Sequence, residues 1–296
     1  MSEEQVKENE QKLEATANKK LSKTDLMAAL EHDFATSVNR IYVNSIGKEI
    51  GFREITVQEQ KSLSRIMIDN EKRKDIVFDA QCALINKACL EPGAFDIYNC
   101  SEFDRLKLLI ALYQANMYKN DVKFTCPQCG ADNQYKLDFD NVLHKLDKIE
   151  LKDEIYNYEN KNWKYEFKLR YPSVKIVSDF HKANIGKYRN ANSSRSIKTI
   201  DNISNIDYIN LFIESIKLQN KNSNTEKNIV MSDYAVKDIE EIMAVFPQDV
   251  LYSDDGVLQY IANNYIKKIN DTFEEHTCYN CGEKYSNDIN SAESFL

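Results

Sequence analysis

Two cysteine pairs that lie far apart in the chain constrain its fold more than any other feature. Cys126 and Cys129 stand in the segment FTCPQCG, Cys278 and Cys281 stand in HTCYNCGEKY, and 148 residues separate the pairs. Each pair has the Cys-x-x-Cys-Gly form of a zinc knuckle, in which a tight turn directs two thiolates at one ion. We therefore expect one structural Zn²⁺ held by Cys126, Cys129, Cys278 and Cys281.

The placement of glycine supports this interpretation. The chain has seven glycines, and two of them, Gly130 and Gly282, directly follow the second cysteine of each pair. A left-handed backbone conformation is often needed at that point of a knuckle, and glycine adopts it without steric cost.

The long separation of the pairs is compatible with a shared ion. Closing a loop of this length costs about 4 kcal/mol, whereas a structural zinc contributes on the order of 10 to 16 kcal/mol. Four thiolates leave no open coordination position for water or substrate, which favours a structural over a catalytic zinc. Two alternatives stay open: independent thiol pairs with redox chemistry, and His276 in place of one cysteine ligand.

Composition limits the remaining possibilities. With 296 residues, of which 42% are hydrophobic, the chain can bury one large core or two modest ones. The start, MSEEQVKENEQ, lacks the basic and apolar regions of a signal sequence, and no apolar run is long enough to span a bilayer, so no membrane association is expected. The number of cysteines, seven, is odd, and four of them stand in metal-type pairs, which fits a reducing compartment better than a disulfide framework. Cys82 and Cys89 are expected to be core residues.

Charge argues against general nucleic-acid binding, because the net charge is −8. One segment, 161–198, is nevertheless basic and interleaved with aromatic residues. Its aromatic residues are Trp163, Tyr165, Phe167, Tyr171 and Tyr188. A zinc-ribbon nucleic-acid-binding accessory protein that uses this segment is therefore the alternative function, against a solvated face or a patch for an acidic protein.

The hydrophobic patterns predict an α+β fold in which a small antiparallel sheet with the zinc knuckles packs against several helices. We expect four regions. They are a disordered or loosely helical arm (1–34), a hairpin plus helical region (35–120), a β region with the first knuckle (121–172) and a mainly helical region that ends in the second knuckle (173–296).

Individual elements follow from the same patterns. A hairpin is expected at 40–55, and a capping box of Thr56 and Glu59 opens a helix that ends near Asp69. Further helices are expected at 72–90, 102–118, 173–185, 206–218, 233–246 and 256–272. Further strands are expected at 122–125, 134–139 and 163–171, with a loop at 190–201.

Catalytic motifs are lacking. The chain has no phosphate-binding loop, because it contains neither a run of closely spaced glycines nor a Gly-Lys-Ser or Gly-Lys-Thr sequence. None of the four histidines stands in a metal-ligand pattern such as His-Glu-x-x-His. The sequence therefore predicts a protein that is not an enzyme.

Three segments carry a resemblance to a known family: KEIGFREITVQEQKSLSR, DIVFDAQCALINKACL and SEFDRLKLLIALYQANMYKNDVKFTCPQCGADNQYKLDF. They resemble the baseplate hub family of T-even-like contractile-tailed bacteriophages. The resemblance implies a non-enzymatic late protein, either a hub subunit or an assembly factor, whose partners are other baseplate hub and tail proteins. It implies a location in the host cytoplasm during assembly or in the tail baseplate of the virion, and it leaves the oligomeric state open. Only the four cysteines are carried over, as the expected metal ligands.

Overall fold

The computed structural model describes residues 22–24, 38–70, 73–116, 121–126, 128–185, 207–223, 225–273 and 275–286. The expected N-terminal arm, apart from residues 22–24, lies outside these residues, as does the expected loop at 190–201. The fold is α+β, as the sequence predicts, with antiparallel strand pairing throughout the described residues.

The strands are β1 (Val38–Val43), β2 (Lys48–Arg53), β3 (Asp121–Thr125), β4 (Asp132–Lys136), β5 (Glu154–Glu159), β6 (Trp163–Leu169), β7 (Ile213–Asn220), β8 (Glu226–Val230), β9 (Glu275–Thr277) and β10 (Lys284–Ser286). The longer helices are α3 (Val57–Asp69), α4 (Lys74–Ala88), α5 (Glu102–Asn116), α6 (Phe139–Asp147), α7 (Val174–Ala183) and α10 (Val236–Ala244). The shorter helical segments are η1 (Ile97–Asn99), η2 (Met231–Asp233), α11 (Gln248–Tyr252), α12 (Val257–Ile261), η3 (Ala262–Ile266) and α13 (Lys267–Asn270).

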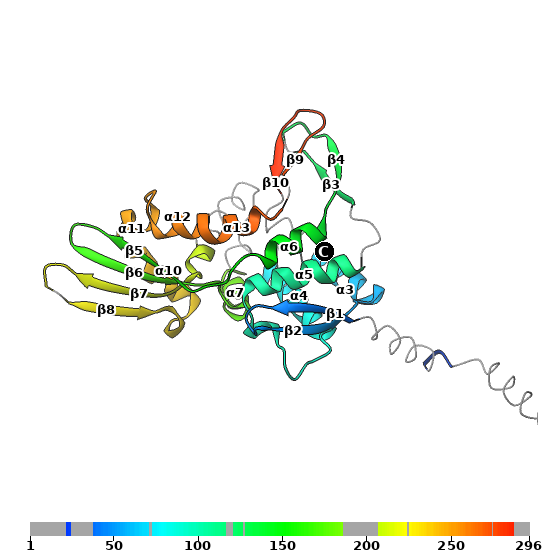
Figure 1. Cartoon of the computed structure of the whole chain (residues 1–296), viewed down its shortest axis with the longest axis horizontal. Coiled ribbons are helices and arrows are strands. Elements are labelled where there is room, and N and C mark those ends of the chain that lie inside the picture. The colour runs from blue at the N-terminus through cyan, green and yellow to red at the C-terminus, as the bar shows by residue number, and fades with distance from the viewer. Residues whose placement is uncertain are drawn as a thin grey trace, which may run out of the picture.

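Three hydrophobic cores organise these elements. The first joins the β1–β2 hairpin to α3, α4, α5 and α7, and the second joins the β5–β8 sheet to α10, α11 and α12. The third joins α5 and α6 to α13. Figure 1 shows the resulting elongated body, with the four-stranded sheet at one end and the helices with the β1–β2 hairpin at the other.

The N-terminal elements form where local sequence predicts them. The hairpin and α3 are confirmed, and the capping box is present: the Glu59 amide donates to Thr56 Oγ1 (3.2 Å), while the Thr56 amide donates to Glu59 Oε2 (2.9 Å). Arg53 at the end of β2 donates to both carboxylate oxygens of Glu59 and holds the pKa of Glu59 well below its usual range. This contact fixes α3 to the hairpin.

Helix α5 is the centre of the molecule. The sequence predicts a single apolar stripe, but every residue from Phe103 to Ile110 is buried. Leu108, Leu109 and Leu112 face the first core, whereas Phe103, Leu106 and Ile110 face the third. The charged residues within this run have partners: Arg105 donates to Gln81 Oε1 (2.7 Å), and Lys107 donates to the Tyr42 carbonyl (2.8 Å).

The four-stranded sheet has the order β5-β6-β7-β8 and is covered on one face. Tyr156, Phe167, Ile216 and Ile229 are aligned across the strands on the face that packs on the second core. The opposite face carries charged pairs such as Lys168–Glu214 and Lys217–Glu226.

Strand β7 corrects one prediction. The spacing of apolar residues predicts a helix at 206–218, but residues 207–210 form only one helical turn and residues 213–220 form an inner strand. Apolar residues at Ile209, Phe212, Ile213 and Ile216 fit a helical period, yet β7 pairs with β6 along one edge and with β8 along the other, and its apolar residues pack into the second core. The sheet therefore joins strands from both sides of the expected boundary at residue 172.

The chain returns from the second core to the third through one continuous helical run. Residues 257–270 pass from α12 through the π-helical turn η3 into α13, which confirms the last predicted helix. Ile269 and Phe273 then pack against Val142 and Leu146 of α6. This packing places the start of β9 beside the end of β4.

Candidate metal centre

The two knuckles fold in the same way. The Cys126 amide donates to the Ala131 carbonyl (2.8 Å), and the Cys278 amide donates to the Glu283 carbonyl (2.7 Å). Within each turn the glycine amide donates back to the carbonyl of the first cysteine, at 2.8 Å for Gly130 and 2.9 Å for Gly282. Both glycines have the expected left-handed conformation, with φ of 72° and 76°.

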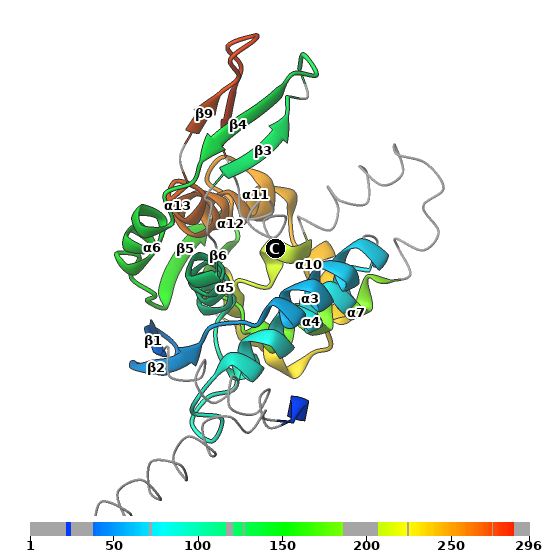
Figure 2. The ribbon, with the colours of Figure 1, turned by 90° about the vertical axis from the view of Figure 1, so that its right-hand side faces the viewer.

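These turns are the tips of two hairpins, β3–β4 and β9–β10. Figures 1 and 2 show both hairpins projecting side by side from the body, above α6 and α13. The two strands predicted around the first knuckle are confirmed, although the second of these strands, β4, ends at Lys136. Phe139 then begins helix α6, which the sequence did not predict.

The hairpins bring the four predicted cysteines together. All four sulfur atoms lie within 4.8 Å of one another, and the Cys126–Cys281 and Cys129–Cys278 sulfur distances are both 3.7 Å. Four sulfurs at tetrahedral corners about 2.3 Å from one zinc lie about 3.8 Å apart. The donor set and its spacing are thus compatible with a tetrahedral thiolate site.

The two knuckles also have the same pattern of cysteine burial. The first cysteine of each pair, Cys126 or Cys278, is 1% exposed, and the second, Cys129 or Cys281, is exposed. The cluster therefore lies at the junction of the hairpins with one side open to solvent.

Asn133 connects the two knuckles, and sequence reasoning missed it. This buried residue on β4 donates from Nδ2 to the Ala131 carbonyl (2.8 Å) and to Cys278 Sγ (3.5 Å), and its Oδ1 accepts from the Tyr279 amide (3.1 Å). Its position four residues after Cys129 is the only local signal, and many loop asparagines share such a position.

The surroundings shift the thiol pKa values in opposite directions. Desolvation raises the pKa of Cys278, but donors from the Cys281 and Asn280 amides and from Asn133 outweigh it and lower this pKa to about 6. At Cys281 the Glu283 amide lowers the pKa, but burial and the adjacent sulfurs raise it to about 12. Such a split is expected when neighbouring thiols share protons and one thiolate is held by several donors.

His276 lies beside the cluster without belonging to it. Its ring stacks on Tyr135 at a centroid distance of 3.6 Å, and the four clustered metal-type ligands are all cysteines. The stacking ties β9 to β4 below the knuckles.

The remaining cysteines are core residues, as predicted for Cys82 and Cys89. Cys82, Cys89 and Cys100 are buried in the first core. Burial raises the pKa of Cys82 and of Cys100 to about 12, which keeps both as unreactive thiols.

The described part of the basic segment does not present its aromatic residues to solvent. Tyr165 and Phe167 are 3% and 0% exposed in the second core, and Trp163 and Tyr171 pack against it. Stacking on nucleic acid requires exposed rings. Tyr188 lies outside the described residues.

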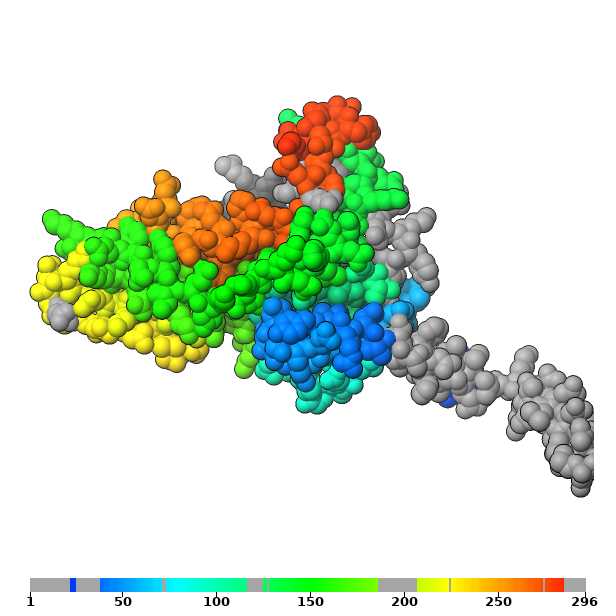
Figure 3. Space-filling model, in the orientation of Figure 1, coloured from blue at the N-terminus to red at the C-terminus, as the bar shows by residue number. Residues whose placement is uncertain are grey.

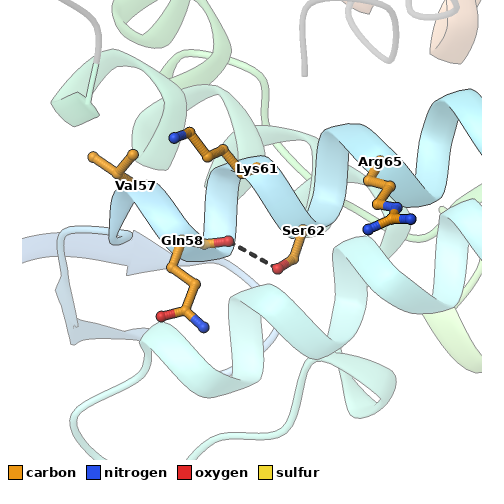
Figure 4. Close-up of a pocket in the computed structure, with 5 residues that line it drawn as sticks. All are labelled: Val57, Gln58, Lys61, Ser62 and Arg65. Atoms are coloured by element: carbon orange, nitrogen blue, oxygen red, sulfur yellow. Dashed lines mark hydrogen bonds between the residues drawn. The ribbon is translucent and has the colours of Figure 1, made fainter.

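Two further observations concern the rest of the surface. An open hollow on α3 is lined by Val57, Gln58, Lys61, Ser62 and Arg65, with no acid–base pair or cysteine among them (Figure 4). Among the residues that the structure describes, every helix is too short or too polar to cross a membrane.

Comparison with known proteins identifies a family. Comparisons with curated proteins and with solved structures gave no significant match. The family described as T4 bacteriophage base plate protein matches residues 35–296, which include all described strands, all the longer helices and both knuckles. The chain therefore belongs to the T4 bacteriophage base plate protein family.

Proposed function

We propose that the chain is a non-enzymatic structural or assembly protein of the phage tail baseplate hub, clamped by a structural Zn²⁺ on Cys126, Cys129, Cys278 and Cys281. It is made in the host cytoplasm during assembly and acts through contacts with other hub and tail proteins. The family match over residues 35–296 carries this proposal, because a baseplate is built from protein–protein contacts. Nucleic acid and membrane have no part in it.

The ion supplies a cross-link between two hairpins that are weak alone. Strands β9 and β10 have three residues each, and an isolated two-stranded hairpin is marginally stable in water. Cys278 and Cys281 hold this hairpin against Cys126 and Cys129 on β3–β4. Helix α13 is already fixed by the third core, so the metal determines the pose of the hairpins and not that of the helices.

Asn133→Ala tests the connection between the knuckles. The substitution removes the donor to Cys278 Sγ and the acceptor for the Tyr279 amide. Loss of such an outer partner typically costs 10- to 100-fold in metal affinity, so we expect zinc to dissociate at about tenfold or more lower chelator concentration. Competition with a chromophoric chelator measures this, and Asn160→Ala, in a surface turn, serves as the matched control. Equal zinc affinity of both variants would contradict the role of Asn133.

The hub assignment is tested in infected cells. A tagged chain, expressed during infection by the phage that encodes it, is expected to sediment with baseplate intermediates, and inactivation of its gene is expected to stop tail formation. Normal tails without the protein would refute the proposal. Retention on DNA or RNA at about 0.05 M salt, with loss at higher salt, would instead favour the nucleic-acid alternative.

A further inference from the structure

The joined tips of the two knuckles form an apex without charge. The sequences CPQCGA (126–131) and CYNCG (278–282) contain no acidic or basic residue, although 29% of the whole chain is charged. The described residues of this apex are exposed apart from Cys126 and Cys278, which are buried, and Ala131, which is half-buried. Figure 3 shows the apex as the end of a projection that stands clear of the body.

Tyr279 is the largest side chain of the apex. It is 76% exposed, more than the exposed tyrosines on the body, such as Tyr252 at 55% and Tyr42 at 47%. Its backbone is nevertheless fixed, because its amide donates to Asn133 Oδ1 on the neighbouring hairpin. An aromatic ring on a fixed backbone loses little conformational entropy when a partner covers it.

Charged residues surround the base of the apex. Asp132 and Glu283 follow the two turns directly, and the Lys284–Glu275 ion pair (2.8 Å) lies on the β9–β10 strands. All four residues are exposed. An uncharged centre that contains an aromatic residue and has a charged border is the usual anatomy of a protein-binding surface.

We propose that this apex is a docking knob, in which Tyr279 enters an uncharged apolar pocket on a partner protein of the baseplate. The proposal rests on the baseplate function proposed above and names the surface that performs it. The absence of charge selects the partner chemistry: an uncharged apex would leave a charged pocket desolvated and unpaired, whereas a pocket of apolar side chains around the Tyr279 ring leaves no charge unpaired.

The same observation argues against nucleic acid at this surface. Binding to a phosphate backbone requires clustered lysine and arginine, and the apex has none. The charged residues at its base include two exposed acids, Asp132 and Glu283, which would repel phosphate.

The experiment uses full-length chain and baseplate intermediates isolated from cells infected with a phage mutant that lacks this gene. Wild-type protein is expected to bind these intermediates in a sedimentation assay. Tyr279→Ala is expected to lower the apparent affinity at least about tenfold, the effect of removing a central aromatic anchor. Tyr279→Phe retains the ring and is expected to bind within about threefold of wild type.

Controls separate the possible results. Tyr252→Ala removes an exposed tyrosine from the body and is expected to bind as wild type does, and zinc content and circular dichroism should match in all variants. Wild-type binding with unchanged binding of Tyr279→Ala would overturn the knob while leaving the hub function intact. Absence of wild-type binding would overturn the hub function itself. Tighter binding of the full-length chain to single-stranded DNA than to the intermediates, lost in Tyr279→Ala, would show that the partner of the apex is a nucleic acid and not a protein.

Discussion

Cys278→Ser is expected to remove most of the bound zinc and to open the β9–β10 hairpin. Cys278 is the buried cysteine of the second knuckle, and its sulfur receives the donors from Asn133 and from its own turn. A structural zinc contributes on the order of 10 to 16 kcal/mol, so the loss of one of four thiolates costs several kcal/mol of binding free energy. Elemental analysis of purified protein measures the zinc content.

The structure limits the damage to the projection. Ile269 and Phe273 remain packed in the third core, so α13 is expected to keep its protection against hydrogen exchange while residues 275–286 lose theirs. Hydrogen exchange with mass spectrometry separates the two segments. Cys89→Ala is the matched control, because this thiol is buried in the first core and should leave zinc unchanged. Full zinc content in Cys278→Ser would show that the four cysteines do not share an ion.

Asp104→Ala is expected to lower the free energy of unfolding by about 3 to 5 kcal/mol. Asp104 is 1% exposed on α5, and its carboxylate accepts from the amides of Asn44 (2.8 Å) and Ser45 (3.0 Å) in the hairpin turn. It also accepts from the hydroxyls of Ser45 and Ser101. Alanine would leave two backbone donors in a partly buried turn without this acceptor, at about 1 to 3 kcal/mol each.

Urea unfolding followed by circular dichroism measures the effect. Asp104→Asn retains one acceptor oxygen and is expected to lose less than Asp104→Ala does. The control is Asp69→Ala, because Asp69 forms an exposed ion pair with Arg65 (3.6 Å), which contributes about 1 kcal/mol or less. If Asp104→Ala and Asp69→Ala unfold at the same urea concentration, the turn does not depend on this carboxylate.

Sequence reasoning was most successful where a structure depends on neighbours along the chain. The capping box of Thr56 and Glu59, the turn of the β1–β2 hairpin and the two glycine-containing knuckles involve contacts over a few residues, and each is present. Strand β5 and helix α6 were missed, although β5 alternates half-buried and exposed residues. Short amphipathic segments carry too few residues for the period to stand out.

The sequence by itself identified the four cysteines that cluster at the candidate metal centre, because Cys-x-x-Cys-Gly requires no partner to form its turn. Tertiary structure decided that residues 213–220 form an inner strand, that residues 103–110 of α5 are buried on all sides and that Asn133 joins the two knuckles. These three outcomes depend on contacts between segments that are distant along the chain. An apolar spacing of three or four residues does not by itself decide whether a segment forms a helix or a strand. Burial of the segment against the rest of the fold contributes more free energy than its local propensity does.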